Sequence, residues 1–395
     1  MYNISMSKTK ALILFTVFID ILGIGIVIPV LPFFVKSFGA SDFTITALFA
    51  TYALCAFISA PILGALSDRI GRRPILIVSI ISSSIGWFIF AGAQNIIFLF
   101  TGRIIDGLAA GNITTAQSYL SDISKDEKDR TSNLGLIGAM FGIGLIVGPL
   151  VGGLLGAINH TLPFYIVGAL ALANAILAYF FLPETHHERT KEKMSVNPLS
   201  PIFRAFAHPV ILPIMIAWFF FNTAIAIQQS IFALYLNKIF GIKELGSGLL
   251  FTGIGVLILI NQLFLLKKFW LARFQRKNLL NGMLIALGVG FIFTSTPWGI
   301  VLGIGVIFTT FGQSLGRTIM TGLVSGLDAV KRGENLGTMN AFASLAMILG
   351  PFIGGSLFII NIHYSFIAAG IFALIALWAV NVGKIFHTKS NYKQT

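Results

Sequence analysis

Four ionisable side chains lie inside long apolar stretches of this 395-residue chain: Asp20, Arg103, Asp106 and Arg317. An uncompensated charge at the centre of a bilayer costs at least about 2.5 to 3.5 kcal/mol on insertion scales. Ionisable residues in such positions therefore mark paths for protons or substrates, or pair with one another. The chemistry that they indicate is proton exchange and ion recognition.

Asp20 has no charged partner in its own apolar run. It lies about ten residues into the run 11–35, which places it some 15 Å deep at a rise of ~1.5 Å per residue. A carboxyl group in a cavity that is wet only part of the time takes up and releases a proton, and the approach or withdrawal of an arginine controls the release. The sequence predicts that Asp20 couples transport to protons.

Arg103 and Asp106 are three residues apart, so they share one face of a helix. Two roles remain open for them. They transfer protons together with Asp20, or they form a permanent ion pair across one helical turn.

Arg317 lies about 16 Å from the end of its apolar run, counted back from Asp328, and no acidic residue lies within the runs of the same half. It either faces Asp20 or Asp106, or binds an anionic group of a substrate, for which its bidentate donor is suited. Uncharged polar residues inside the runs are candidates for the cavity wall, and each is equally suited to bridging helices. They are Asn112, Gln117, Asn222, Gln228, Gln229, Gln313 and Asn340.

The composition is that of a polytopic membrane protein. Hydrophobic residues make up 56% of the chain and charged residues 10%, whereas a soluble domain has about 25% charged residues. The net charge of +13 comes from bases in short gaps between apolar runs, so it does not indicate nucleic-acid binding. The only cysteine, Cys55, excludes disulfides within the chain and thiolate metal sites.

Twelve apolar runs are long enough to cross a bilayer as helices, for which about 20 residues are needed. They lack the alternation of barrel strands, so an all-α fold is predicted. The runs are 11–35, 43–66, 74–93, 96–121, 133–157, 162–182, 209–236, 246–266, 278–296, 299–326, 336–360 and 364–386.

Charge asymmetry predicts the orientation. Of 27 Lys and Arg, 22 fall on one side of the predicted membrane and only Lys36, Lys238 and Lys243 on the other. Because basic loops stay in the cytoplasm, both termini are predicted to be cytoplasmic.

The chain repeats itself at an offset of 202 residues. Arg130-Thr-Ser-Asn-Leu-Gly135 returns as Arg332-Gly-Glu-Asn-Leu-Gly337, and Gly148-Pro149 returns as Gly350-Pro351 in the same register. We therefore predict two parallel six-helix repeats, residues 1–182 and 209–395, that rock around a central cavity. A polar cytoplasmic linker, 183–208, joins them; its adjacent His186 and His187 point apart and do not indicate a metal site.

A short charged hinge separates the second and third runs. Two glycines, one acid and three bases lie there before Pro74. The glycines and the proline suit a tight backbone reversal, and the charges place it outside the hydrocarbon. Its marked residues are Gly64, Asp68, Arg69, Gly71, Arg72 and Arg73.

The hinge resembles the loop between the second and third helices of the major facilitator superfamily, in the drug:proton antiporter group that includes tetracycline exporters. Ile19-Asp20-Ile21 is similar to the first-helix motif of the group, and Gly102-Arg103…Asp106-Gly107 to the fourth-helix motif, whose arginine is associated with proton transfer. The run 133–157 resembles the antiporter motif, in which glycines allow close helix packing and proline bends the helix. Its residues here are Gly144, Gly148, Pro149, Gly152 and Gly153.

The resemblance also implies that Asp122 meets the hinge. With Asp68 and Arg72 it forms a charge cluster that latches the outward-facing state. The alternative is a solvated pair at a helix end, worth under about 1 kcal/mol.

The predicted function is that of a monomeric secondary transporter in the bacterial inner membrane, which exports a small organic molecule in exchange for protons. No enzymatic activity, cofactor or metal is expected, and because the sequence has no ATP-binding loop, transport either draws on an ion gradient or runs downhill. Uptake of an anionic metabolite or iron chelate by the same fold is the alternative, motivated by Arg317. Tetracycline exporters carry an acid and a histidine on helices nine and eight, where this chain offers only Asn261, Gln262 and Asn281.

Overall fold

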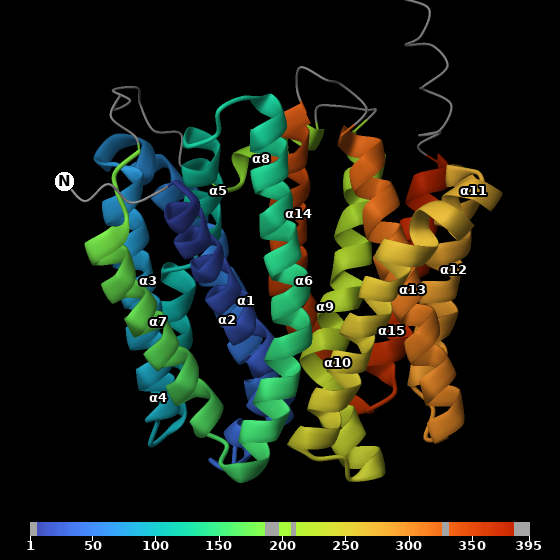
Figure 1. Cartoon of the computed structure of the whole chain (residues 1–395). Helices are drawn as coiled ribbons and strands as arrows, with labels where there is room; N and C mark the ends of the chain where they lie inside the picture. Colours follow the sequence, from blue (N-terminus) through green and yellow to red (C-terminus); the bar gives the residue numbers. More distant parts are fainter. Residues whose placement is uncertain (1–5, 186–196, 207–210, 326–331, 383–395) are drawn as a thin grey trace, which may run out of the picture. The chain divides into compact units, whose positions relative to one another are not determined.

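The structure is a computed structural model that describes residues 6–185, 197–206, 211–325 and 332–382 (Figure 1). Its described residues form helices and no strands, and twelve segments are long and apolar enough to span a membrane, which confirms the predicted all-α class. The helices of the first part of the chain are α1 (Met6–Lys36), α2 (Asp42–Ile70), α3 (Arg72–Ala91), α4 (Ile96–Leu108), α5 (Asn112–Asp122), α6 (Glu127–Ile158) and α7 (Leu162–Phe181).

The second part begins with a short helix, α8 (Ser200–Phe206), inside the stretch that the sequence predicts as linker. The adjoining linker residues 186–196, with both histidines, lie outside the described residues. The remaining helices are α9 (Leu212–Phe240), α10 (Glu244–Ile260), η1 (Asn261–Trp270), α11 (Leu271–Arg273), α12 (Arg276–Thr294), α13 (Gly299–Ser325), α14 (Arg332–Ile360) and α15 (Tyr364–Val382).

Two spans differ from the predicted continuous helices. The run 96–121 is broken at residues 109–111, between α4 and α5, where a side chain on Gly111 would collide with Leu63 of α2. The run 246–266 extends to Arg273 and changes from α-helix to the π-helix η1 at Asn261. At both places the chain contacts a neighbouring helix, which hydropathy does not record.

The turn between α2 and α3 depends on Gly71. Its φ of 121° lies in the region that favours glycine. The backbone N–H groups of Arg72 and Arg73 donate to the carboxylate of Glu184 at 3.0 and 3.2 Å. An acidic side chain at a helix N-terminus satisfies N–H groups that have no partner within the helix, so Glu184 fixes the start of α3.

The chain divides into two compact units. The first comprises residues 1–41, 51–197 and 242–252, and the second comprises residues 42–50, 198–241 and 253–395. In the first unit α1 packs against α6 and α3 against α4 and α7, and in the second α9 packs against α14 and α15, and α12 against α13. The predicted halves with boundaries at 182 and 209 stay a prediction.

The internal repeat is visible in the packing. A Cβ placed on Gly148 of α6 would lie 2.9 Å from the carbonyl oxygen of Leu22 in α1. A Cβ on Gly350 of α14 would lie 3.1 Å from the carbonyl oxygen of Thr223 in α9. Equivalent glycines therefore permit equivalent helix crossings in the two units.

Candidate functional site

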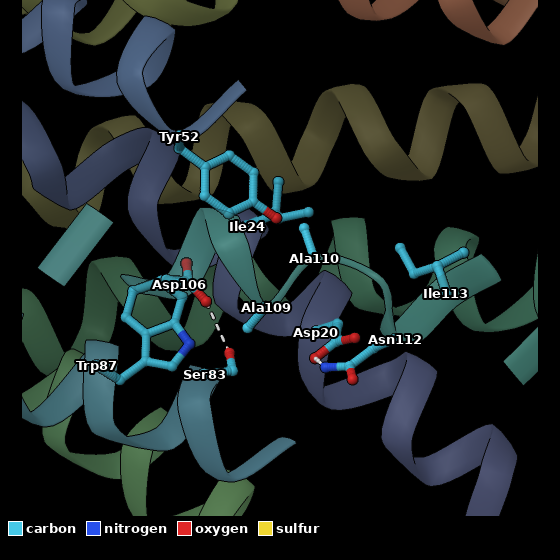
Figure 2. A pocket seen from close by; sticks show the side chains of 10 residues that line it. All are labelled: Asp20, Ile24, Tyr52, Ser83, Trp87, Asp106, Ala109, Ala110, Asn112 and Ile113. Carbon is cyan, nitrogen blue, oxygen red and sulfur yellow. Dashed lines mark hydrogen bonds between the residues drawn. The ribbon is translucent and has the colours of Figure 1, made fainter. Parts of the chain in front are cut away.

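A small pocket of about 20 Å³ lies within the first unit, between α1, α2, α3 and the broken span α4–α5 (Figure 2). Two carboxylates, Asp20 and Asp106, line the same space although they are 86 positions apart. The other lining residues are Ile24, Tyr52, Ser83, Trp87, Ala109, Ala110, Asn112 and Ile113.

Asp20 is half-buried and hydrogen-bonded to Asn112. The side-chain amide of Asn112 donates to Asp20 Oδ1 at 3.2 Å (Figure 2). Asn112 is the first residue of α5, directly after the break at 109–111, so the break positions this amide. Within the described residues, Asp20 forms no ion pair. This carboxyl group is therefore held in place without a cation that would keep it charged.

Arg103 and Asp106 pair with each other. Their Nη1 and Oδ2 atoms are 3.2 Å apart, both residues are buried, and the hydroxyl of Ser83 donates to Asp106 Oδ1 at 2.7 Å. The Arg103 guanidinium also lies 4.3 Å from the ring centroid of Tyr52 and 5.8 Å from that of Trp87. Cation–π contacts and a carboxylate together meet the charge of a buried arginine. The predicted pairing geometry is present, and a part in proton transfer stays a hypothesis.

Sequence reasoning missed Tyr52, Ser83 and Trp87. Ser83 belongs to the run Ser82-Ser83-Ser84, in which nothing local distinguishes the serine that meets Asp106 from its neighbours. Tyr52 and Trp87 read as ordinary apolar aromatics of their spans. Only the packing of α2 and α3 around α4 gives them a charge to contact.

The hinge charges also come together. Arg72 is buried and forms ion pairs with Asp68 and with Asp122, its Nε lying 3.1 Å from Asp122 Oδ2. Its Nη1 donates to Ser67 Oγ at 2.6 Å. The arrangement is the predicted charge cluster, to which the structure adds Glu184 on the backbone of Arg72. A part for this cluster in latching one conformation stays a prediction.

Arg72→Ala is expected to destabilise the protein by about 1 to 2 kcal/mol, because it removes a buried cation that Asp68 and Asp122 share, while their partly exposed carboxylates stay solvated. The check is thermal unfolding of the purified protein in detergent. Lys10→Ala provides the control, since the partly exposed pair Lys10–Asp129, 3.7 Å apart, is worth under about 1 kcal/mol. Equal losses in the two variants would contradict a special role for Arg72.

The glycines of α6 face two partners. Gly144, Gly148 and Gly152 lie against α1, where added Cβ atoms would meet Ile21, Gly25 and Ile26 respectively. Gly153 lies instead against α10, and its Cβ would be 3.0 Å from Gly248 Cα. Pro149 lies inside α6, between Gly148 and Gly152. The motif is a close-packing device in this structure, and its link to antiport stays a prediction.

Arg317 belongs to the second unit. Its Nη2 donates to Asn222 Oδ1 at 3.4 Å, its guanidinium lies 5.7 Å from the Trp218 ring centroid, and the side chain is exposed. No carboxylate of the described residues forms an ion pair with it.

The other predicted cavity residues differ in exposure. Gln228 is buried, Gln229 and Gln313 are half-buried, and Gln117 and Asn340 are exposed.

Comparisons with known proteins show which protein family the chain belongs to. Residues 13–325 and 230–391 match the sequence profile of the Major Facilitator Superfamily. The chain is 30% identical to the class C tetracycline resistance protein of Escherichia coli, over 88% of this chain and 89% of that protein. It is 28% identical to multidrug resistance protein 2 of Bacillus subtilis (strain 168), over 97% of both chains.

A solved structure of a bacterial homologue of the human lysosomal transporter Spinster, inward-facing and unoccupied, superposes with a TM-score of 0.77 at 17% identity, over 98% of this chain and 99% of that one. At 17% identity, that likeness concerns the fold alone. The two resistance proteins are the relatives that resemble this chain in sequence. Together with the twelve spans, these matches show that the chain belongs to the major facilitator superfamily and is a multi-pass membrane transporter with drug-resistance proteins among its relatives, not an enzyme.

Proposed function

We propose that the protein exports a small organic molecule in exchange for protons, by alternating access. The single observation that carries the coupling is Asp20, a half-buried carboxyl inside a membrane span that lines a pocket and has no ion-pair partner among the described residues. The relatives are named for resistance to tetracycline and to multiple drugs, which supports export of organic compounds.

The surroundings of Asp20 favour it over Asp106 as the proton carrier. Arg103 and Ser83 both bind Asp106, which stabilises its charged form, whereas Asp20 receives one hydrogen bond from the neutral amide of Asn112. A single neutral amide donor stabilises a carboxylate less than an arginine and a hydroxyl do together. A proton arriving in the pocket thus has Asp20 as its acceptor, and the loss of negative charge lowers the cost of moving α1 through a closed state.

The alternative function is uptake of an anionic metabolite or iron chelate. It is favoured by Arg317, whose exposed guanidinium has no carboxylate partner in the described part of the chain. The two proposals differ in the direction of substrate movement and in the charge that the site prefers.

The proposal also covers the membrane location, the orientation and the oligomeric state of the protein. The apolar surface of twelve spans places the protein in a lipid bilayer, and we infer the bacterial inner membrane, with both termini cytoplasmic, as the positive-inside rule predicts. No cofactor takes part, and the transporter acts as a monomer.

The test is proton flux in proteoliposomes that contain a pH-sensitive dye. A pH gradient is imposed, and tetracycline, ethidium or an anionic siderophore is added on the side opposite to the higher proton concentration. Export in exchange for protons predicts that an organic drug, and not the siderophore, dissipates the gradient. Substrate movement with no change in proton flux would refute coupling while leaving transport intact.

A further inference from the structure

Five bases lie within eleven positions of the second unit, where the chain passes from η1 through α11 into α12. All of them are exposed except Lys277, which is half-buried. The sequence has no acidic residue between Glu244 and Asp328 to balance them. We call this cluster the basic turn; its members are Lys267, Lys268, Arg273, Arg276 and Lys277.

The basic turn has no acidic partner in the described part of the chain. None of its five side chains forms an ion pair with a described carboxylate. Bases near other span ends do form such pairs, and examples are Lys10 with Asp129, Arg204 with Glu334 and Lys238 with Asp42. Because crowded like charges repel one another, the basic turn attracts anions from its surroundings.

The equivalent turn of the first unit contains an acid that the basic turn lacks. Arg69-Ile-Gly-Arg-Arg73 aligns with Arg273-Phe-Gln-Arg-Lys277 at an offset of 204 residues, which preserves the three bases. Ala272 stands in the position that Asp68 occupies in the first unit. The internal repeat therefore keeps the cations of this turn and loses an anion.

The two turns also differ at the start of the following helix. In the first unit the Glu184 carboxylate accepts hydrogen bonds from the backbone N–H groups of Arg72 and Arg73, at 3.0 and 3.2 Å. In the second unit α12 begins at Arg276, and no side chain forms a capping hydrogen bond there. One turn thus holds its own anions, whereas the other has the same cations without them.

The basic turn lies at a membrane boundary. It joins the end of the span Glu244–Arg273 to the start of the span Arg276–Thr294. Phe269, Trp270 and Phe274 lie within the same eleven positions, and their rings contact one another with centroids 4.8 to 6.2 Å apart. Aromatic side chains of this kind are enriched at the depth of the lipid headgroups. The anions that the membrane offers at this depth are lipid phosphates.

Contacts within the second unit fix the shape of this surface. Trp270 Nε1 donates to Asn261 Oδ1 at 2.8 Å, and Asn261 Nδ2 donates to Ser314 Oγ in α13 at 3.0 Å. The Arg273 guanidinium lies 4.5 Å from the ring centroid of Phe269. A surface that is already ordered loses less conformational entropy when it binds a ligand.

We propose that the basic turn binds the headgroups of anionic phospholipids, whose phosphates take the part that acidic side chains have at the equivalent turn of the first unit. Arginine binds a phosphate through two parallel hydrogen bonds, and lysine binds it as a point charge. Clusters of about four to eight bases directly beside a membrane span are typical of anionic-lipid binding. Lipid binding at this surface does not depend on the substrate, the direction of transport or proton coupling.

The experiment measures which lipid lies beside Trp270. The purified protein is reconstituted into phosphatidylcholine vesicles that contain a rising fraction of phosphatidylglycerol with brominated acyl chains, which quench nearby tryptophans. Quenching that disappears in Trp270→Phe belongs to Trp270. Brominated phosphatidylcholine, added in the same amounts, provides the zwitterionic reference.

Phosphatidylglycerol is expected to be enriched beside Trp270 at least about tenfold over phosphatidylcholine, because each base near anionic headgroups contributes a factor of about five. High salt is expected to reduce the enrichment, since it screens exposed charges. Equal quenching by the two lipids would overturn the proposal.

Lys267→Gln combined with Lys268→Gln is expected to lower the enrichment at least about fivefold. Lys267→Arg combined with Lys268→Arg keeps both charges and is expected to keep the enrichment. The matched control is Lys8→Gln with Lys10→Gln, which removes two bases from another span end and is expected to leave the lipid beside Trp270 unchanged.

Two results with these variants would overturn the lipid surface. The first is full enrichment after both lysines have become glutamine, because the charges would then have no part in it. The second is an equal loss in the control variant, which would show a response to net charge and not to the basic turn.

Discussion

Asp20→Asn is expected to abolish uphill export while leaving downhill exchange of substrate intact. The amide has nearly the same shape as the carboxylic acid and keeps a contact with Asn112, which now donates to Asp20 at 3.2 Å. It cannot bind or release a proton in the relevant pH range, so the transporter loses its link to the gradient without losing its ability to rock.

The measurement is accumulation of a fluorescent substrate in inverted vesicles energised by a pH gradient. In the variant, accumulation falls to the level of vesicles without the protein, whereas counterflow of labelled against unlabelled substrate continues.

The matched control is Asp129→Asn, which removes a partly exposed carboxyl at the start of α6 and is expected to leave accumulation unchanged. Asp106→Asn separates the two roles left open for that residue. If Asp106 only neutralises Arg103, its variant loses stability and keeps coupling. Uphill export by Asp20→Asn at the parent rate would refute the assignment of coupling to Asp20.

Gly148→Ala is expected to lower the free energy of unfolding by about 2 kcal/mol, despite the better helix propensity of alanine. Its Cβ would lie 2.8 Å from Gly25 Cα and 2.9 Å from the Leu22 carbonyl oxygen. Both are backbone atoms, which cannot move aside as a flexible side chain does. Overpacking of this kind costs about 1 to 3 kcal/mol, and in this case the α6–α1 crossing must open.

Gly142→Ala on the same helix is the control. Nothing lies within 4 Å of the position that its Cβ would take, so the variant is expected to be neutral or to gain up to about 1 kcal/mol from helix propensity. Melting curves of the two variants in one detergent make the comparison. Equal stability would show that α6 and α1 are not held at this distance, and that the glycines of the motif serve another purpose.

The class of the protein and its candidate functional residues follow from the amino-acid sequence alone. Hydropathy fixed twelve spans, because each helix must satisfy its own backbone in lipid. The cost of a charge in hydrocarbon singled out Asp20, Arg103, Asp106 and Arg317 without any knowledge of their neighbours. The repeat at 202 residues predicted that Gly148 and Gly350 occupy equivalent places, and both meet the backbone of a neighbouring helix.

Tertiary structure alone decided which partners these residues have. The break at 109–111 brings Asn112 to Asp20, and the packing of α2 and α3 brings Tyr52 and Ser83 to the Arg103–Asp106 pair. The π-helix of η1 places Asn261 and Gln262 against α13. Each of these contacts joins residues far apart in the chain or depends on a local departure from the α-helix. The free energy that sets them comes from packing between helices, and the hydropathy of a single helix carries no record of it.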